Sequence, residues 1–225
     1  MGQATIKQRI YSRILDEIVA KKYPVDCILK EKELSEKFGV SKAPVREALV
    51  ELSKENIVKS IPRAGYRIVQ FTGKDISEAT ELRLILELSA LDTIIGSIRR
   101  ESLQRLHAEV EKAAASRRHG VVPVDVWWNN NIRFHVALNA EAGNSLLTST
   151  LESVLNRLWR AIAQLFWSGD SEDYLGFKPD KHIALLRVIE EKDSAEARKI
   201  LSEDIFSIRG LFEGRPSFFP GKTTP

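Results

Sequence analysis

The chain has 225 residues, of which 43% are hydrophobic and 29% are charged, a composition typical of soluble globular proteins that bury a core. No apolar run is long enough to cross a membrane, and the N-terminus lacks the apolar segment of a signal peptide. The single cysteine, Cys27, cannot form an internal disulfide. These features argue against a membrane protein or a disulfide-stabilised secreted protein, and they favour the reducing cytoplasm.

The net charge of +3 is unevenly distributed along the chain. Residues 1–74 contain 15 Lys and Arg against 9 Asp and Glu, whereas residues 75–225 contain 19 against 22. A basic N-terminal region is the electrostatic signature expected of a domain that binds nucleic-acid phosphates. Ordinary solvated surface charge is the alternative explanation for so small an excess.

The first predicted element is an amphipathic helix over residues 5–21, which Pro24 stops. Its isoleucines recur every fourth residue and share one face, which would pack against the helices that follow (Ile6, Ile10, Ile14, Ile18). A second, shorter helical pattern covers residues 31–38. Gly39 follows it, at a place where helices commonly end in a left-handed residue.

Residues 41–70 predict a third helix followed by a short hairpin. Ser41 can serve as the N-cap, and Pro44 falls in the first turn, where a missing N–H costs nothing. Apolar residues line one face of this helix, and Lys42 and Arg46 project from another. Two extended pieces then enclose a Pro-Arg-Ala-Gly tip. Two helices joined by a short turn and followed by a basic hairpin are typical of a winged helix-turn-helix.

Residues 33–65 carry an ordered set of motifs: ELSEKFGVSKAPVREAL at 33–49, ENIV at 55–58 and PRAG at 62–65. They resemble the DNA-binding domain of the GntR family of bacterial transcription regulators. The resemblance implies DNA-facing roles for seven residues: Lys32, Ser41, Lys42, Ala43, Arg46, Arg63 and Gly65. The family often has Arg in place of Lys32 and Lys42. Because Lys cannot make the planar fork to guanine, we expect Arg46 to carry most of the base discrimination.

Beyond a short linker at 72–74, the remaining sequence has helical patterns and no strand pattern. We expect helices near residues 75–96, 101–118, 123–142, 144–168, 178–191 and 193–211. Asp75 with Glu78 and Asp193 with Glu196 resemble capping pairs. The predicted fold is mainly α, a winged helix-turn-helix followed by an all-α antiparallel helical bundle. The expected boundaries are residues 1–72, 75–213 and a loosely ordered tail at 214–225.

Four polar residues interrupt helix faces that are otherwise apolar: Asn131, His135, His182 and Asp204. Buried polar groups need partners, so each one taken alone could be a hydrogen-bonded core residue. Two imidazoles, a carboxylate and an amide on the inner faces of three helices favour a shared site. The interior of a helical bundle is where such sites are built.

The second half carries sparser motifs in order: ELRLILE at 81–87, Phe134-His135, Asn144, His182 and residues 193–197. They resemble the FCD effector-binding domain that accompanies this winged helix in FadR-like regulators. In many members of that family, one Asp and three His hold a divalent metal at the four polar places. Here Asn131 takes the Asp place and Asp204 takes the last His place. The resulting set could hold Zn²⁺, Ni²⁺ or Mn²⁺, and a metal-free polar pocket is the alternative.

Arg83 is a further polar residue on an apolar helix face. It could form an i,i+4 ion pair with Glu87, or it could face the pocket and pair with a ligand carboxylate. We expect an effector site formed by Arg83, Trp128, Asn139 and Asn144. A fixed cation, a metal and few acidic groups favour a small carboxylic acid as the effector.

The sequence therefore predicts a ligand-responsive transcription regulator that binds double-stranded DNA and has no membrane partner. The resemblance implies a homodimer on a palindromic operator, with repression relieved by a metabolite as the commoner behaviour. One alternative is a metal-dependent enzyme that uses the four polar residues of the second half. Another is a DNA-binding protein without an effector.

Overall fold

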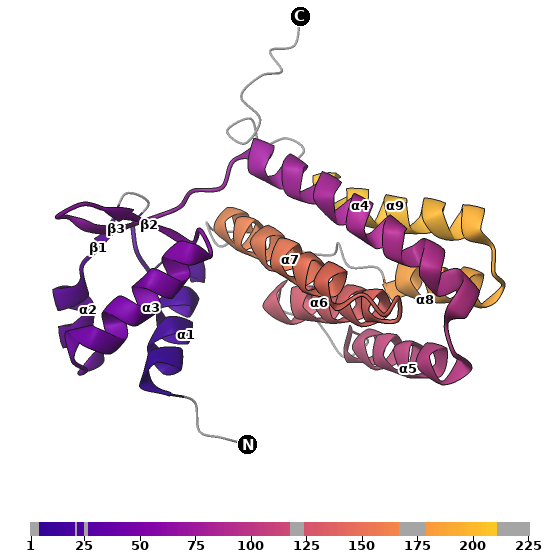
Figure 1. The fold of residues 1–225 in the computed structure, drawn as a ribbon, viewed down its shortest axis with the longest axis horizontal. Coiled ribbons are helices and arrows are strands. Elements are labelled where there is room, and N and C mark those ends of the chain that lie inside the picture. Colours follow the sequence, from indigo (N-terminus) through magenta and orange to yellow (C-terminus); the bar gives the residue numbers. More distant parts are fainter. Residues whose placement is uncertain (1–4, 21, 25–26, 118–123, 167–178, 211–225) are drawn as a thin grey trace, which may run out of the picture. The chain divides into compact units, whose positions relative to one another are not determined.

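The computed structural model describes residues 5–20, 22–24, 27–117, 124–166 and 179–210 (Figure 1). The chain divides into two compact units. One comprises residues 1–71 and 160–170, and the other comprises residues 72–159 and 171–225. In the part of the chain that the structure describes, no helix has the length and apolar character needed to span a membrane.

Three helices form the body of the first unit: α1 (Ile6–Val19), α2 (Glu31–Phe38) and α3 (Lys42–Lys54) (Figure 1). A reciprocal capping box between Thr5 and Gln8 begins α1. Gly39 ends α2 in the left-handed conformation, at φ 66°, as expected from the sequence. The predicted apolar faces of these helices form one core, which includes Ile14, Val45 and Leu49 at 0% exposure.

A three-stranded antiparallel sheet completes the first unit, in the order β1-β3-β2. The hairpin of β2 (Val58–Ile61) and β3 (Gly65–Ile68) is the predicted wing. Strand β1 (Ile28–Leu29), which pairs with Arg67 and Tyr66 of β3, was not predicted. Asn56 has φ 55°, the left-handed conformation that asparagine tolerates better than most residues.

The second unit is built from helices within the part of residues 72–210 that the structure describes. These are α4 (Gly73–Ser97), α5 (Arg100–Arg117), α6 (Val124–Ala140), most of α7 (Ser145–Phe166), α8 (Pro179–Glu190) and α9 (Ser194–Gly210). Each lies within a few residues of its predicted range. Figure 1 shows α4 and α9 running side by side, and their contacts agree. The predicted class, a winged helix-turn-helix followed by a helical bundle, is confirmed.

One predicted helix start is wrong in detail. Thr72, not Asp75, is the N-cap of α4, and Asp75 is the third residue of a capping box with it. The cause is that Gly73 and Lys74 are already helical, so the reciprocal hydrogen bonds begin three residues earlier than expected. The second capping pair is confirmed, because the Glu196 N–H donates to Asp193 Oδ1 at 3.0 Å. The predicted tail at 214–225 lies outside the described residues.

The core of the second unit draws on several of its helices. Leu106 from α5, Phe134 and Leu138 from α6, Leu186 from α8 and Leu201 from α9 are all buried in one cluster. Arg83 and Glu87 of α4, His135 of α6 and His182 of α8 are also buried, at 0–3% exposure. Charged and polar groups this deeply buried require partners, and these residues form the centre of the candidate site.

Candidate functional site

The start of α3 carries most of the residues expected to face DNA. Ser41 is its N-cap, but the Ser41 hydroxyl accepts no capping hydrogen bond. Ser41, Lys42 and Ala43 are all exposed at this end of the helix. Lys32, on α2, is 73% exposed and approaches Glu36 within 3.9 Å. These side chains are therefore placed where they could contact a ligand outside the protein.

Arg46 projects from the same helix but is already engaged within the protein. Its Nε donates to Glu31 Oε1 at 2.9 Å, and its Nη2 donates to Glu31 Oε2 at 2.8 Å. The Arg46 side chain nevertheless remains 63% exposed. The hydrogen bond from Arg46 holds the pKa of Glu31 below its usual range, so the pair is fully charged at neutral pH.

The wing tip is shaped by backbone conformation. Arg63 is exposed and has φ 64°, and Gly65 has φ 133°. A Cβ on Gly65 would lie 2.5 Å from the backbone oxygen of Leu29, because β3 begins directly against β1. Gly65 is therefore required by the packing of the wing, whatever its contact with DNA.

Two basic residues of the wing were not singled out from the sequence. Lys59 and Arg67 are directly opposite each other in the β2–β3 ladder, and both are exposed. Like charges in such a pair are destabilising in isolation. A polyanion beside the hairpin would offset that repulsion. The sequence could have indicated this pair, because residues that lie opposite each other in a hairpin place their side chains on the same face of the sheet.

Asp204 lies at the centre of the buried polar cluster in the second unit. Its Oδ2 lies 3.1 Å from His135 Nε2, 3.6 Å from His182 Nε2 and 3.9 Å from Arg83 Nη2. Three helices, α6, α8 and α9, thus bring together three of the four predicted metal ligands. Asn131, the fourth, is buried one turn before His135 on α6.

Glu87 joins this cluster, a role that the sequence did not predict. Its Oε1 accepts from Arg83 Nε at 2.6 Å, which confirms the i,i+4 ion pair considered for Arg83. Its Oε2 lies 2.6 Å from His135 Nδ1. Glu87 therefore joins Arg83 to His135 across two helices.

The cluster shifts the pKa values of its members in different directions. Burial alone would raise the pKa of Asp204, but the adjacent His135 and His182 imidazoles outweigh burial and hold that pKa well below its usual range. Burial would likewise raise the pKa of Glu87, and His135 and Arg83 outweigh that effect. Burial lowers the pKa of His182. For His135, burial is outweighed by Glu87, which raises the pKa. One imidazole thus favours the cation and the other the neutral form.

The donor set fits a divalent transition metal. One nitrogen of His135, one of His182 and one oxygen of Asp204 lie within 4.8 Å of one another. His135 Nε2 is buried, and its approach to Asp204 lacks the geometry of a hydrogen bond, so this nitrogen has no hydrogen-bond partner among the described residues. Two imidazoles and a carboxylate are ligands that Zn²⁺, Ni²⁺ and Mn²⁺ accept.

The predicted effector residues already have structural roles. Trp128 is buried and stacks on Trp159, with ring centroids 6.2 Å apart. Asn144 caps α7 by accepting from Leu147 N at 3.0 Å. Asn139 Oδ1 accepts from Thr148 Oγ1 at 3.1 Å, while its Nδ2 is buried without a hydrogen-bond partner within the described ranges. An effector role for these residues stays a prediction.

A basic winged helix-turn-helix, followed in the chain by a helical unit with a buried His–His–carboxylate cluster, defines a two-domain transcription regulator. Residues 6–68 match the bacterial regulatory proteins of the gntR family, and residues 78–206 match the FCD domain. The chain belongs to the GntR family of DNA-binding transcription regulators and carries an FCD domain. Its relatives are regulators and not enzymes, which sets the enzyme alternative aside.

Individual relatives agree with this assignment. An uncharacterized HTH-type transcriptional regulator of Bacillus subtilis, YdhC, is 31% identical over 142 residues, which cover 63% of this chain and 62% of YdhC. The chain thus spans less than two thirds of the length of that relative. The gluconate operon transcriptional repressor of Bacillus licheniformis is 22% identical over 95% of this chain and 87% of its own. The structure of E. coli McbR/YncC has the same fold, with a TM-score of 0.73 at 19% identity over 93% of this chain and 97% of that one.

Proposed function

We propose that this regulator is a cytoplasmic repressor that binds a palindromic operator as a homodimer. We also propose that its second unit holds a divalent metal and a small carboxylic acid, which changes its affinity for DNA. Repression is supported by relatives named as repressors, such as that of the gluconate operon in Bacillus licheniformis. A two-fold protein on a two-fold DNA site is the geometry that a single helix-turn-helix per chain favours.

The operator contacts would come from α2, α3 and the wing. We assign them to Lys32, Ser41, Lys42, Ala43, Arg46, Arg63 and Gly65, with Arg46 reading a base and the lysines holding phosphates. The exposure of Lys32, Ser41, Lys42, Ala43 and Arg46 supports this assignment. Lys59 and Arg67 would add phosphate contacts along the wing.

The convergence of His135, His182 and Asp204 carries the proposal of a ligand-binding second unit. These three residues would hold the metal, and the amide oxygen of Asn131 would be a weaker fourth ligand. When bound, such a metal supplies a Lewis-acidic centre that a carboxylate oxygen can join. Glu87 would orient His135 for this role through Nδ1, as carboxylates commonly do for metal-binding histidines.

Charge balance explains why an acid is the expected effector. With both imidazoles neutral, a divalent metal and Arg83 face the carboxylates of Glu87 and Asp204, which leaves one net positive charge in a buried site. Uncompensated buried charge is costly. A single carboxylate would neutralise it, whereas a neutral sugar or an amine would not.

Two measurements on the full chain test this proposal. Protein supplemented with Zn²⁺, Ni²⁺ or Mn²⁺ and gently desalted should retain bound metal and melt at a higher temperature. Small carboxylic acids should then stabilise it further, and one of them should change operator affinity by about 1–3 kcal/mol, a typical coupling between two sites. If the desalted protein retains no metal, the proposed metal site is wrong. A screen in which neutral compounds act and no acid does would refute the acid effector, and a screen without any active compound would favour a regulator that has no effector.

A further inference from the structure

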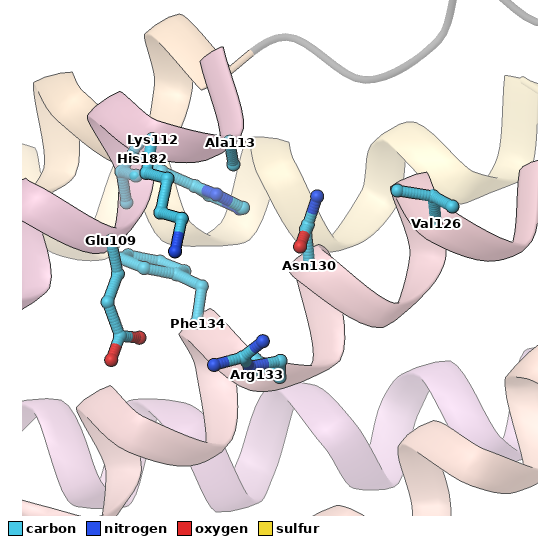
Figure 2. A pocket seen from close by; sticks show the side chains of 9 residues that line it. Glu109, Lys112, Ala113, Val126, Asn130, Arg133, Phe134 and His182 are labelled. Carbon is cyan, nitrogen blue, oxygen red and sulfur yellow. The ribbon is translucent and has the colours of Figure 1, made fainter. Parts of the chain in front are cut away.

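A cavity of about 310 Å³ in the second unit is lined mainly by residues of α5 and α6, and also by His182 of α8 (Figure 2). Because His182 is one of the residues proposed to hold the metal, this cavity adds no site beyond the one already proposed. The first unit, in contrast, contains a charged pair that the proposed function leaves unexplained. Arg46, the residue expected to read a base, is bound by the carboxylate of Glu31.

Glu31 and Arg46 belong to the two helices of the helix-turn-helix and are 15 residues apart in the chain. Glu31 is the first residue of α2, and its side chain is only 23% exposed. The two helices share an apolar core that includes Leu34 of α2 and Val45 and Leu49 of α3. The carboxylate is therefore fixed relative to the backbone that carries Arg46.

The contact between the two side chains is bidentate. Oε1 of Glu31 accepts from Arg46 Nε at 2.9 Å, and Oε2 accepts from Nη2 at 2.8 Å. Glu33, the other carboxylate in the first turn of α2, pairs instead with Lys30 at 2.8 Å. Two-point, charge-assisted pairing fixes the plane of a guanidinium as well as its position. Since exposed ion pairs add little to stability, the main effect of Glu31 is on the orientation of Arg46.

Glu31 occupies only one edge of the guanidinium. The edge formed by Nη1 and the second hydrogen of Nη2 has no hydrogen-bond partner among the residues that the structure describes. A guanidinium carries five N–H donors, so this open edge is a second fork. Such a fork matches the O6 and N7 acceptors of guanine in the major groove. Arg46 can therefore keep its contact with Glu31 while it reads a base.

The charge of Glu31 affects how Arg46 discriminates between bases and phosphates. The hydrogen bond from Arg46 and the nearby charge of Lys42, one turn earlier on α3, outweigh burial and lower the pKa of Glu31, so the carboxylate is ionised at neutral pH. An ionised partner compensates the charge of Arg46 and weakens its attraction to phosphates, which every DNA sequence offers. Hydrogen bonds from the open edge to a base depend on geometry and are retained.

We infer that Glu31 is a positioning residue for base reading. By holding the guanidinium in one orientation, it reduces the side-chain freedom that Arg46 would lose on binding a base. Its negative charge also opposes unselective contact between Arg46 and phosphates. Glu31 therefore raises the preference for operator over random DNA. This inference rests on the proposed function, which assigns base reading to Arg46.

Binding of the full chain to two DNA probes tests this role. One probe is a duplex that the wild-type protein selects from a random-sequence pool, and the other is the unselected pool. Glu31→Gln removes the charge and one of the two acceptor oxygens. It should weaken binding to the selected duplex and leave binding to the pool unchanged or stronger. The ratio of the two affinities should fall about three- to tenfold, a part of the discrimination that a bidentate base contact supplies.

Glu31→Asp separates the reach of the side chain from its charge. Aspartate keeps the negative charge, but its side chain is one methylene shorter, so the two-point pairing with Arg46 is lost. The affinity ratio should fall in this variant too, while binding to the pool stays close to that of wild type. If Glu31→Asp behaves as wild type and only Glu31→Gln lowers the ratio, the effect is purely electrostatic and the positioning role is wrong.

Dependence on Arg46 distinguishes this role from a general effect on the fold. In an Arg46→Ala background, neither substitution of Glu31 should change the ratio. On the unselected pool, Arg46→Ala should reduce the salt dependence of binding more in Glu31→Gln than in wild type, because the arginine charge is no longer compensated. Glu33→Gln is the matched control, since it removes an exposed carboxylate from the same first turn of α2 and should leave the ratio unchanged.

An unchanged ratio in Glu31→Gln, together with a lowered ratio in Arg46→Ala, would overturn the role of Glu31 alone. A ratio that Arg46→Ala does not lower would refute base reading by Arg46 and this inference with it, so the two failures are distinguishable. A loss in Glu31→Gln that persists without Arg46 would contradict the inference. So would tighter binding of Glu31→Gln to the selected duplex, because Glu31 would then mask Arg46.

Discussion

His135 Nδ1 and Glu87 Oε2 lie 2.6 Å apart, and both side chains are buried. Because an ionised carboxylate only accepts hydrogen bonds, this contact places a proton on Nδ1. The other nitrogen, Nε2, lies 3.1 Å from Asp204 Oδ2. A carboxylate behind a histidine in this way orients the ring and raises its basicity as a metal ligand. Glu87 would thus orient His135 for the proposed metal site.

Glu87→Gln should weaken zinc binding by about 10–100-fold, the usual effect of losing a carboxylate behind a metal-binding histidine. Glutamine can still accept from Nδ1, but it lacks the charge that supports the imidazole. Competition with a chromogenic chelator measures the affinity. Glu141→Gln is a suitable control, because Glu141 belongs to an ion pair with Arg105 elsewhere in the same unit. Equal zinc affinity in Glu87→Gln and wild type would contradict a role for Glu87 at the site.

Zinc binding should weaken as the pH falls from 7 to 5, because both imidazoles must be neutral to bind metal. Burial alone would lower the pKa of His135, but Glu87 outweighs burial and raises it, so protons compete with zinc at this residue near neutral pH. In the metal-free protein the sign is opposite. There the raised pKa of His135 stabilises the fold below its unfolded pKa, and that stability is lost as the pH rises through the folded pKa. Zinc affinity and the urea stability of the metal-free protein, each measured at several pH values, test this prediction. It would be wrong if both quantities changed in the same direction as the pH falls.

The sequence predicted the elements that are specified by neighbouring residues. It missed contacts between residues that are far apart in the chain. Helix limits follow apolar periodicity and caps, so even the left-handed Gly39 was predictable. Strand β1 is two residues long and exists because Leu29 pairs with Tyr66, a partner that no local pattern identifies. The cluster of His135, His182 and Asp204 was predictable, because each of these polar residues interrupts an otherwise apolar helix face. Glu87 escaped notice because its spacing to Arg83 already explained it, while His135 is 48 residues away.

Arg46→Ala should cost about 1–3 kcal/mol on the operator and should relax base specificity, because it removes the fork expected to read a base. Lys42→Ala should instead weaken binding to all DNA and reduce its salt dependence, as expected for a phosphate contact. Binding curves on operator and random DNA at several salt concentrations separate the two effects. Equal losses on both DNAs for Arg46→Ala would remove its assignment as the base-reading residue.

Glu17 should contribute to the stability of the winged helix in a pH-dependent way. It is 7% exposed, accepts from Lys37 Nζ at 2.8 Å and also accepts from the Tyr23 hydroxyl. Burial alone would raise the pKa of Glu17, but these hydrogen bonds outweigh it and lower the pKa. A lowered pKa means that the stabilisation is present above the unfolded pKa and is lost as the pH falls through the folded value.

Glu17→Gln should therefore lower the free energy of unfolding by about 1 kcal/mol at pH 7, with a smaller difference in acid. Urea denaturation of the full chain at neutral and acidic pH measures it. Asp16→Asn, which changes an exposed neighbour on the same helix, should have little effect at either pH. A difference for Glu17→Gln that stays constant across this range would argue against the ionised carboxylate as its source.

Arg83→Met should make the second unit less stable yet more responsive to metal. Arg83 is 3% exposed and faces both Glu87, at 2.6 Å, and Asp204, at 3.9 Å. Its loss leaves buried carboxylates without their cation, and breaking a buried ion pair in this way costs about 3–5 kcal/mol. A divalent ion at His135, His182 and Asp204 would then restore the balance of charge. The increase in melting temperature on adding zinc should therefore be larger in Arg83→Met than in wild type.

Arg198→Met is the matched control for this prediction. Arg198 pairs with Asp92 at a half-exposed position between α9 and α4, so its loss should change neither the stability nor the response to zinc by much. If zinc stabilises both proteins equally, the charge of Arg83 does not act on the metal site, and its role is confined to the pair with Glu87.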